Sequence, residues 1–398
     1  MNDRPEVLAR APDHPLARLK EAREARGLSL KDLADRLGTN RQLVYRYQEG
    51  EIRATPSAVA RFAAALNVPI GFFMRPEAPP EPAAVFFRQF RSKTTPKHLR
   101  AVERQLAWVR DFIVALEQYV VLPDVTVPDF KPPSDPQQIS DELIDVAATE
   151  LRRAWGMSNG VVRDVIRLVE GHGCVVVPNV IESPTVDGFS IWAHNGRPII
   201  AIGCREVSAS HRRTDVAHEL GHLVLHRNID RRYLEVNPKT HGLIETQAFR
   251  FARAFLMPEG TFRRSVSPVT LDNLLLAKTH WYLSVATMMT RAKDLGMIDD
   301  ATYKRFWMNR NRRGWGTSEP LDEQIPMEHP RLLATAIVTL RDAHPENLLA
   351  LSEEVGLLPS DFARFCALDP KELDANHNDD PFGIYPRDDQ PEPWRRRA

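Results

Sequence analysis

His218 and His222 flank Glu219 in the segment His218-Glu219-Leu220-Gly221-His222, which fills the pattern H-E-x-x-H. The motif lies in residues 212–226, which read as one helix, and residues four apart share one face of a helix, so both imidazoles can reach one metal ion. The intervening carboxylate is placed to act on a water that the metal activates rather than to bind the metal. Three fixed positions also occur by chance, so the surrounding residues must support this prediction of a hydrolytic metal centre.

A third protein ligand is needed, with the fourth position left for water. Glu245 begins a predicted helix, and at helical spacing its face continues with apolar residues only: Ala248, Phe249, Ala252, Phe255 and Leu256. A carboxylate heading an apolar face requires a partner or a metal, so we predict Glu245 as the third ligand. The alternative is a first-turn carboxylate stabilised by the helix dipole. The competing ligands are Asp230, Glu235 and His241.

His226 lies four residues beyond His222 but is a poor candidate for a third ligand. On a rigid helix the outer imidazoles, at 218 and 226, are about 12 Å apart, so we expect His226 to support the site or end the helix. His241 and Tyr233 are candidate donors to the oxyanion of the transition state. Two imidazoles and one carboxylate predict Zn²⁺, although the same donors accept Mn²⁺.

The elements that must position this site include both helices and strands. Helices are predicted at 141–155, 160–172, 212–226, 244–256, 271–294 and 300–309, and a short buried strand at 173–178. Residues 189–192 and 198–202 flank Asn195-Gly196, which predicts a β-hairpin. The strand 198–202 offers either an edge on which an extended peptide docks or ordinary support for the core.

The first 75 residues predict short helices, among them 28–38 and 40–48, joined by a turn at Gly38. Ser29 is a good N-cap with Asp32 three residues later, and the pair of helices predicts a helix-turn-helix. In that geometry the second helix faces DNA base edges and flanking cations bind phosphates. The predicted base-edge residues are Asn40, Arg41, Gln42, Tyr45 and Arg46, and the predicted phosphate contacts are Lys31 and Arg53. A small helical bundle that binds protein is the alternative.

Charge is unevenly placed along a chain of zero formal net charge. Residues 1–100 carry 18 Lys and Arg against 11 Asp and Glu, a balance of +7, and the remainder carries −7. A basic front on an acidic body suits duplex DNA at one end of the protein. The three cysteines are far apart, which argues against a disulfide framework or a Cys-rich zinc site. No apolar run reaches the roughly 18–20 residues that span a bilayer, so we expect a cytoplasmic protein without a membrane partner.

The predicted fold class is α+β and mainly helical. It comprises an all-α helix-turn-helix domain, a zincin-like domain with a small sheet, and a helical C-terminal region. The predicted boundaries are 1–75 for the first domain, 76–137 for Pro-rich linkers around a long helix at 99–120, 138–265 for the peptidase domain, 266–318 for a helical extension, and 319–398 for the C-terminal region with its tail.

Two resemblances follow from these motifs. Residues 16–75 resemble the phage-repressor-type (XRE/Cro) helix-turn-helix domain in the segments 27–34, 47–50 and 72–73. The block 217–226, together with 244–248 and 255–258, resembles the ImmA/IrrE metallopeptidases, as do the strands at 189–192 and 197–200 and the helical segment at 278–296. The likeness spans roughly residues 16–315.

The second resemblance implies a gluzincin-like zinc peptidase, and it places the metal ligands at His218, His222 and Glu245 and the catalytic carboxylate at Glu219. Some members of that group cleave a helix-turn-helix repressor and so release stress or mobile-element genes. One departure lies at 48–50, where the repressor-like family often has Tyr-Glu-x-Gly; we expect only a local change at the helix end.

Together the resemblances imply a DNA-binding transcription regulator with a built-in zinc endopeptidase. It would cleave a repressor-like protein, or itself, in response to a stress or mobile-element signal. One alternative is a repressor whose peptidase fold only senses a metal or ligand; another is a plain peptidase that uses the front helices to dock its substrate. A homodimer is expected, because such DNA-binding domains usually read paired half-sites.

Overall fold

The computed structural model describes residues 14–76, 86–87, 96–181, 188–203, 207–229, 238–368, 382 and 384–386. The chain forms two compact units. Unit 1 comprises Met1–Pro82, Phe90–Val121 and Ala334–Ala398, and unit 2 comprises Ala83–Gln89 and Leu122–Leu333. The five-part division expected from the sequence stays a prediction. The described residues contain no helix with both the length and the apolar character needed to cross a bilayer.

Unit 1 begins with four short α-helices and a 3-10 turn. They are α1 (Leu19–Ala25), α2 (Leu30–Leu37), α3 (Arg41–Gln48), α4 (Pro56–Leu66) and η1 (Ile70–Met74). Ser29 and Asp32 form a capping box that starts α2, and Gly38 ends it in the left-handed region with φ 63°. Asn40 then caps α3. The predicted pair of helices joined at Gly38 is therefore confirmed, and each end of the turn has an identifiable capping residue.

The long helix α6 (Pro96–Leu116) packs against α1 and α17 within unit 1. Its Trp108 Nε1 donates to Glu21 Oε1 on α1 at 2.8 Å, and its Phe112 ring stacks on Phe362 at 4.6 Å. The remaining elements are β2 (Val120–Val121), α16 (Leu332–Ala343), which begins at the end of unit 2, α17 (Pro345–Val355), α18 (Pro359–Cys366) and β6 (Tyr385–Pro386). Helices from both ends of the chain thus share one core.

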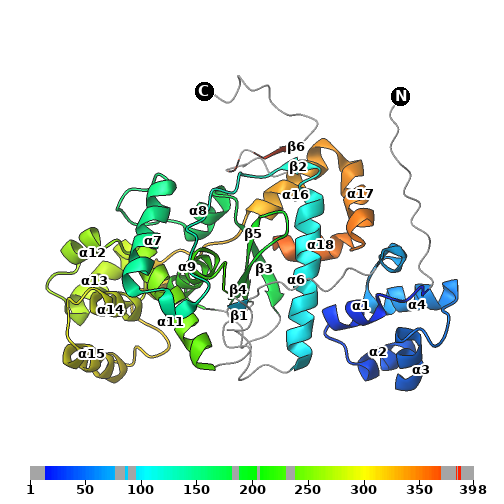
Figure 1. The fold of residues 1–398 in the computed structure, drawn as a ribbon, viewed down its shortest axis with the longest axis horizontal. Helices are drawn as coiled ribbons and strands as arrows, with labels where there is room; N and C mark the ends of the chain where they lie inside the picture. The colour runs from blue at the N-terminus through cyan, green and yellow to red at the C-terminus, as the bar shows by residue number, and fades with distance from the viewer. Residues whose placement is uncertain are drawn as a thin grey trace. The chain divides into compact units, whose positions relative to one another are not determined.

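Unit 2 combines a small sheet with helices from the middle of the chain (Figure 1). Its helices are η2 (Pro136–Gln138), α7 (Asp141–Ala154), α8 (Val165–Gly171), α9 (Ala209–Leu225), α11 (Pro238–Leu256), α12 (Glu259–Ser265), α13 (Leu271–Trp281), α14 (Val285–Asp294), α15 (Asp300–Arg312) and η3 (Asp322–Gln324). The helical stretch predicted at 271–294 is two helices, because Tyr282 ends α13 in the left-handed region with φ 56°. The mainly helical α+β class is confirmed.

The sheet of unit 2 has the strand order β1-β4-β5-β3. Its strands are β1 (Phe86–Phe87), β3 (Val175–Ile181), β4 (Gly188–Trp192) and β5 (Pro198–Gly203). The predicted hairpin is confirmed, with Ile191 opposite Ile199. Of the two roles left open for 198–202, the edge is wrong and core support is confirmed, because β5 pairs antiparallel with β4 and parallel with β3. Its uninterrupted apolar run suits a central strand buried on both faces.

Candidate metal centre and DNA-binding surface

Helix α9 carries the two histidines of the H-E-x-x-H motif on one face. Ser208 caps its N-terminus, and its motif residues His218, Glu219 and His222 are all buried. The four-residue spacing leaves the two Nε2 atoms only 3.0 Å apart. Two imidazole nitrogens that face the same point are the beginning of a metal site.

Glu245, on α11, completes a group of three. Its Oε2 lies 3.3 Å from His218 Nε2 and its Oε1 lies 3.4 Å from His222 Nε2. The ligand atoms of these three residues all lie within 4.8 Å of one another, and this is the only such group of His, Cys, Asp and Glu found in the described part of the chain. His241 is not in the group, while Asp230, Tyr233 and Glu235 lie outside the described residues.

The donor set fits a divalent metal ion. Two imidazoles and a carboxylate are typical zinc ligands and leave a fourth position for water. Burial raises the pKa of Glu245, but hydrogen bonds and charge from His218 and His222 outweigh burial and hold the pKa of that carboxyl well below its usual range. The carboxylate is therefore in the ionised form that metal binding requires.

His226 supports His222 instead of joining the ligand group. It follows the last residue of α9, and its Nδ1 lies 2.9 Å from Nδ1 of His222. Its Nε2 lies 3.2 Å from Oε1 of Gln247 on α11, which accepts only when that Nε2 carries a proton. The same arrangement makes His222 Nδ1 a donor to His226 and leaves His222 Nε2 facing Glu245. Burial, helped by the nearby imidazole of His222, lowers the pKa of His226 well below its usual range, so the ring is neutral.

A residue of the sheet holds the Glu219 side chain in position. The hydroxyl of Ser190 on β4 donates to Glu219 Oε2 at 2.9 Å and also lies 3.0 Å from the Glu219 carbonyl oxygen. A Cβ atom on Gly188 would lie 3.1 Å from Glu219 Oε1, so the carboxylate sits directly against the backbone of the strand. Sequence reasoning missed Ser190, although one polar residue between Phe189 and Ile191 in a buried strand was a usable signal.

Gly221 lets the two helices of the site approach closely. A Cβ atom there would lie 3.1 Å from the Ala248 carbonyl oxygen and 3.1 Å from Cδ1 of Phe251, both on α11. Contacts that short are essentially at the limit of what packed atoms tolerate. The variable fourth position of the motif is therefore glycine because a larger residue would not fit between α9 and α11. The close approach of these two helices places Glu245 within reach of the two imidazoles.

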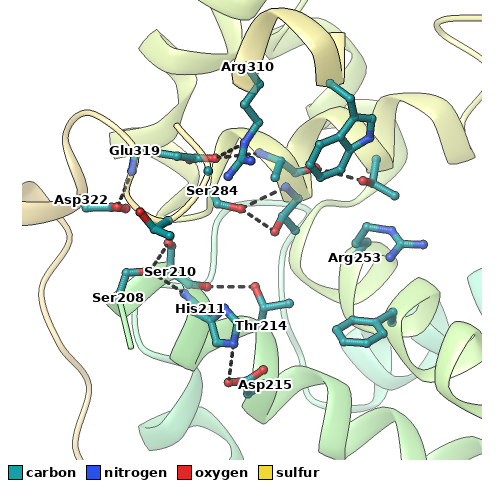
Figure 2. Close-up of a pocket in the computed structure, with 17 residues that line it drawn as sticks. Ser208, Ser210, His211, Thr214, Asp215, Arg253, Ser284, Arg310, Glu319 and Asp322 are labelled. Carbon is teal, nitrogen blue, oxygen red and sulfur yellow. Dashed lines mark hydrogen bonds and ion pairs between the residues drawn. The ribbon is translucent and has the colours of Figure 1, made fainter. Parts of the chain in front are cut away.

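A pocket of about 320 Å³ lies along the first turns of α9 and ends one turn before His218 (Figure 2). Most of its lining residues are polar, among them the pairs His211–Asp215 at 3.3 Å and Arg310–Glu319 at 3.1 Å. Phe249 links pocket and metal site, since it lines the pocket and its ring centroid lies 4.1 Å from that of His218. The two sites are thus separated by one aromatic ring.

The helix-turn-helix presents its predicted DNA contacts to solvent. All seven are exposed: Lys31, Asn40, Arg41, Gln42, Tyr45, Arg46 and Arg53. On α3, Val44 and Tyr47 face inward, since Val44 is buried and the Tyr47 ring packs edge-on against Phe62 at 5.4 Å. Asn40 also has a structural role that was not predicted from the sequence. It is the N-cap of α3, where its Oδ1 accepts from the Leu43 amide at 2.8 Å.

These features define a protein with a helix-turn-helix at one end and a metallopeptidase-type domain in the middle. Residues 16–71 match the family model described as a helix-turn-helix domain, and residues 169–290 match the one described as an IrrE N-terminal-like domain. The second match contains His218, Glu219, His222 and Glu245. No curated protein matches the chain in a sequence search. The two resemblances seen in the sequence are confirmed for these two segments, and together the segments support a regulator that joins a DNA-binding domain to a metallopeptidase-type domain.

Proposed function

We propose that this protein is a cytoplasmic transcription regulator that carries a zinc-dependent endopeptidase and cleaves a repressor-like protein, or itself, when a stress or mobile-element signal arrives. The observation that carries the proposal is the convergence of His218, His222 and Glu245 beside Glu219. A chain that only bound DNA would have no use for a buried carboxylate held next to that group.

The proposed chemistry divides between the ion and the protein. A Zn²⁺ ion held by His218, His222 and Glu245 would lower the pKa of a water molecule and polarise a peptide carbonyl, and Mn²⁺ suits the same donors. Glu219 takes the proton from the attacking water and later gives it to the leaving amine. Ser190 holds that carboxylate in place from β4. His226 and Gln247 fix the orientation of the His222 ring.

The outer edge of β4 supports an extended protein substrate. On that edge β1 pairs antiparallel with β4, Phe86 opposite Ser190 and Phe87 opposite Phe189. An extended segment therefore fits beside the strand that holds Glu219. Beyond β1, residues 191–192 of β4 pair only with β5 among the described strands. We propose that a substrate segment docks beside residues 191–192, next to β1, by strand addition, which replaces the role expected for β5.

The decisive experiment is Glu219→Gln. The variant should keep its metal, because residue 219 is not in the ligand group, and it should lose cleavage of an added helix-turn-helix repressor or of the protein itself. Glu259→Gln, an exposed carboxylate in the first turn of α12, is the matched control and should cleave normally. Full cleavage by Glu219→Gln would refute the proposed role.

The pocket in Figure 2 favours a second candidate function, in which the peptidase fold senses a small polar ligand without proteolysis. Its wall contains neither His218 nor Glu219, so a ligand could occupy it without touching the metal site. Signal-dependent gene regulation that persists unchanged in Glu219→Gln would select this candidate over proteolysis.

DNA binding should be tested separately. If α2 and α3 contact a duplex, affinity should fall steeply as salt rises, because bound cations release counterions from the phosphates. A flat response would instead support the use of these helices for docking protein. We further propose a homodimer that reads two half-sites, which sedimentation with and without duplex DNA would check.

A further inference from the structure

A basic hollow of about 440 Å³ lies within unit 1, between helices of the helix-turn-helix and the start of α6. Its charged lining residues are Arg23, Glu24, Lys31, Arg41, Lys97 and Arg100. Five of these six are cationic, and such a concentration of one sign attracts an anion. The hollow therefore favours binding of a negatively charged partner.

Two of the lining residues establish which way the hollow faces. Lys31 is at the start of α2 and Arg41 begins α3, and both are exposed residues assigned to DNA from the sequence. Because Lys97 and Arg100 line the same hollow, the first turns of α6 lie on the DNA-facing side of the domain. These two residues fall outside the helix-turn-helix match at 16–71.

We propose that Lys97 and Arg100 grip backbone phosphates of the DNA duplex, so that α6 extends the DNA-binding surface beyond the helix-turn-helix itself. This inference rests on the proposed binding of DNA by α2 and α3. A phosphate strand that passes Lys31 reaches the α6 cations next, and contacts of this kind add affinity and fix orientation without reading sequence.

Helix α6 is held in position for this role. Gln105 Nε2 donates to the Ala25 carbonyl oxygen at 2.8 Å, and Trp108 donates to Glu21 on the same helix, α1. Arg104 Nε lies 3.3 Å from Glu24 Oε2. These contacts attach α6 to the helices that include α3. Lys97 and Arg100 therefore need no large rearrangement to reach the phosphates of a DNA duplex.

The two cations are also available to phosphates. Lys97 pairs with Asp32 at 3.0 Å, but both side chains are 44% exposed, and such surface pairs contribute little. Arg100 is 52% exposed and lies 3.6 Å from Glu24, which keeps Arg104 as a partner when Arg100 turns to DNA. If Lys97 and Arg100 leave these weak pairs to bind phosphates, the buried carboxylate of Glu24 still has Arg104 as a partner.

The test measures the affinity of the full-length protein for a random-sequence DNA duplex across a range of salt concentrations. In the double variant Lys97→Ala/Arg100→Ala, the slope of log affinity against log salt should become shallower by about 0.9 for each lost phosphate contact, about 1.8 in all. The matched control is Lys304→Ala/Arg312→Ala, which removes two exposed cations of α15 in unit 2 and should leave the slope unchanged. Lys97→Arg/Arg100→Lys should preserve it as well.

The outcomes separate this inference from the proposed function. A slope equal to that of the wild type in the α6 double variant, with thermal unfolding unchanged, overturns the role of α6. If the wild type itself shows no salt-dependent DNA binding, or if Lys31→Ala/Arg41→Ala binds DNA as the wild type does, DNA binding by the helix-turn-helix is what fails. A third outcome is that inorganic phosphate stabilises the wild type but not the α6 double variant, while both bind DNA with the same salt dependence. That result would assign the hollow to a free anion and would also overturn the proposal.

Discussion

The Ser190 hydroxyl donates to Glu219 Oε2 at 2.9 Å across the boundary between β4 and α9. The hydrogen bond joins a sheet residue to the carboxylate inside the H-E-x-x-H motif. It ties the position of the proposed general base to the strand on which a substrate segment would dock.

Ser190→Ala should therefore lower turnover more than it alters substrate binding. A hydrogen bond to a charged group contributes roughly 1.5–3 kcal/mol, which corresponds to a fall in kcat of about ten- to a hundredfold if the bond is needed to orient Glu219. The measurement is kcat and KM on a cleaved protein substrate, with metal content determined alongside. Ser265→Ala, which removes a hydroxyl on α12, is the control. An unaltered kcat in Ser190→Ala would rule out the positioning role.

Glu245→Ala should reduce the metal content of the purified protein. The loss removes the one anionic member of the ligand group, so the fall in affinity should exceed the 10–100-fold typical of residues that only support a ligand. Thr246→Ala, at the exposed neighbouring position on α11, should retain the metal. Equal metal content in the two variants would contradict the assignment of Glu245, and DNA binding should be the same in both.

Gly221→Ala should destabilise unit 2. The added methyl group would press on the Ala248 carbonyl oxygen and the Phe251 ring, and overpacking of this kind typically costs about 1–3 kcal/mol. Gly242→Ala on α11 meets nothing within 4 Å and should be neutral or stabilising by about 0.5–1 kcal/mol. The free energy of unfolding in denaturant decides between them, and a neutral Gly221→Ala would show that α9 and α11 can move apart.

Stability should depend on pH through Glu170, a buried carboxyl that accepts from the amides of Arg331 and Leu332. Burial raises its pKa to about 8, only partly opposed by those hydrogen bonds and by the charge of Arg331, and Asp164 raises it further. A folded-state pKa above the ordinary 4.5 means that folding favours the protonated form. Its contribution to stability is present in full below pH 4.5 and is lost as the pH rises towards 8.

The measurement is the free energy of unfolding of the wild type and of Glu170→Gln between those two pH values. The wild type should lose stability relative to the variant as the pH rises, because an amide does not ionise. A difference that stays constant, or grows in favour of the wild type, would contradict the raised pKa.

The candidate metal centre was largely predictable because its signals are local. Helical spacing alone puts His218 and His222 on one face, and a carboxylate followed by apolar residues at helical spacing pointed to Glu245. The helix itself begins at Pro238 and not near Glu245, so Glu245 is not a first-turn residue. The same reasoning about helix geometry kept His226 out of the ligand group, and the structure places it against His222 instead. The ends of α2 and α3 were readable for a similar reason, since capping residues act within one turn.

Other features depend on contacts between distant parts of the chain and were not predictable. The partner of Glu219 comes from β4, and only tertiary packing brings Ser190 to it. The apolar run at 198–202 suits either an edge or a central strand, and only its pairing with β3 decides between them. Likewise, no local pattern indicates that Trp108 of α6 bonds to Glu21 of α1.

Unit 2 is a nested domain, because the chain leaves unit 1 after Val121 and re-enters it at Ala334. A single cut within 122–333 would therefore split unit 1 into two covalently separate fragments. The ring stack of Phe112 on Phe362 and the rest of their shared core would still bind those fragments to each other. Self-cleavage there would leave the helix-turn-helix attached to α17 and α18, so loss of the proposed DNA binding would require a second event that separates the two fragments.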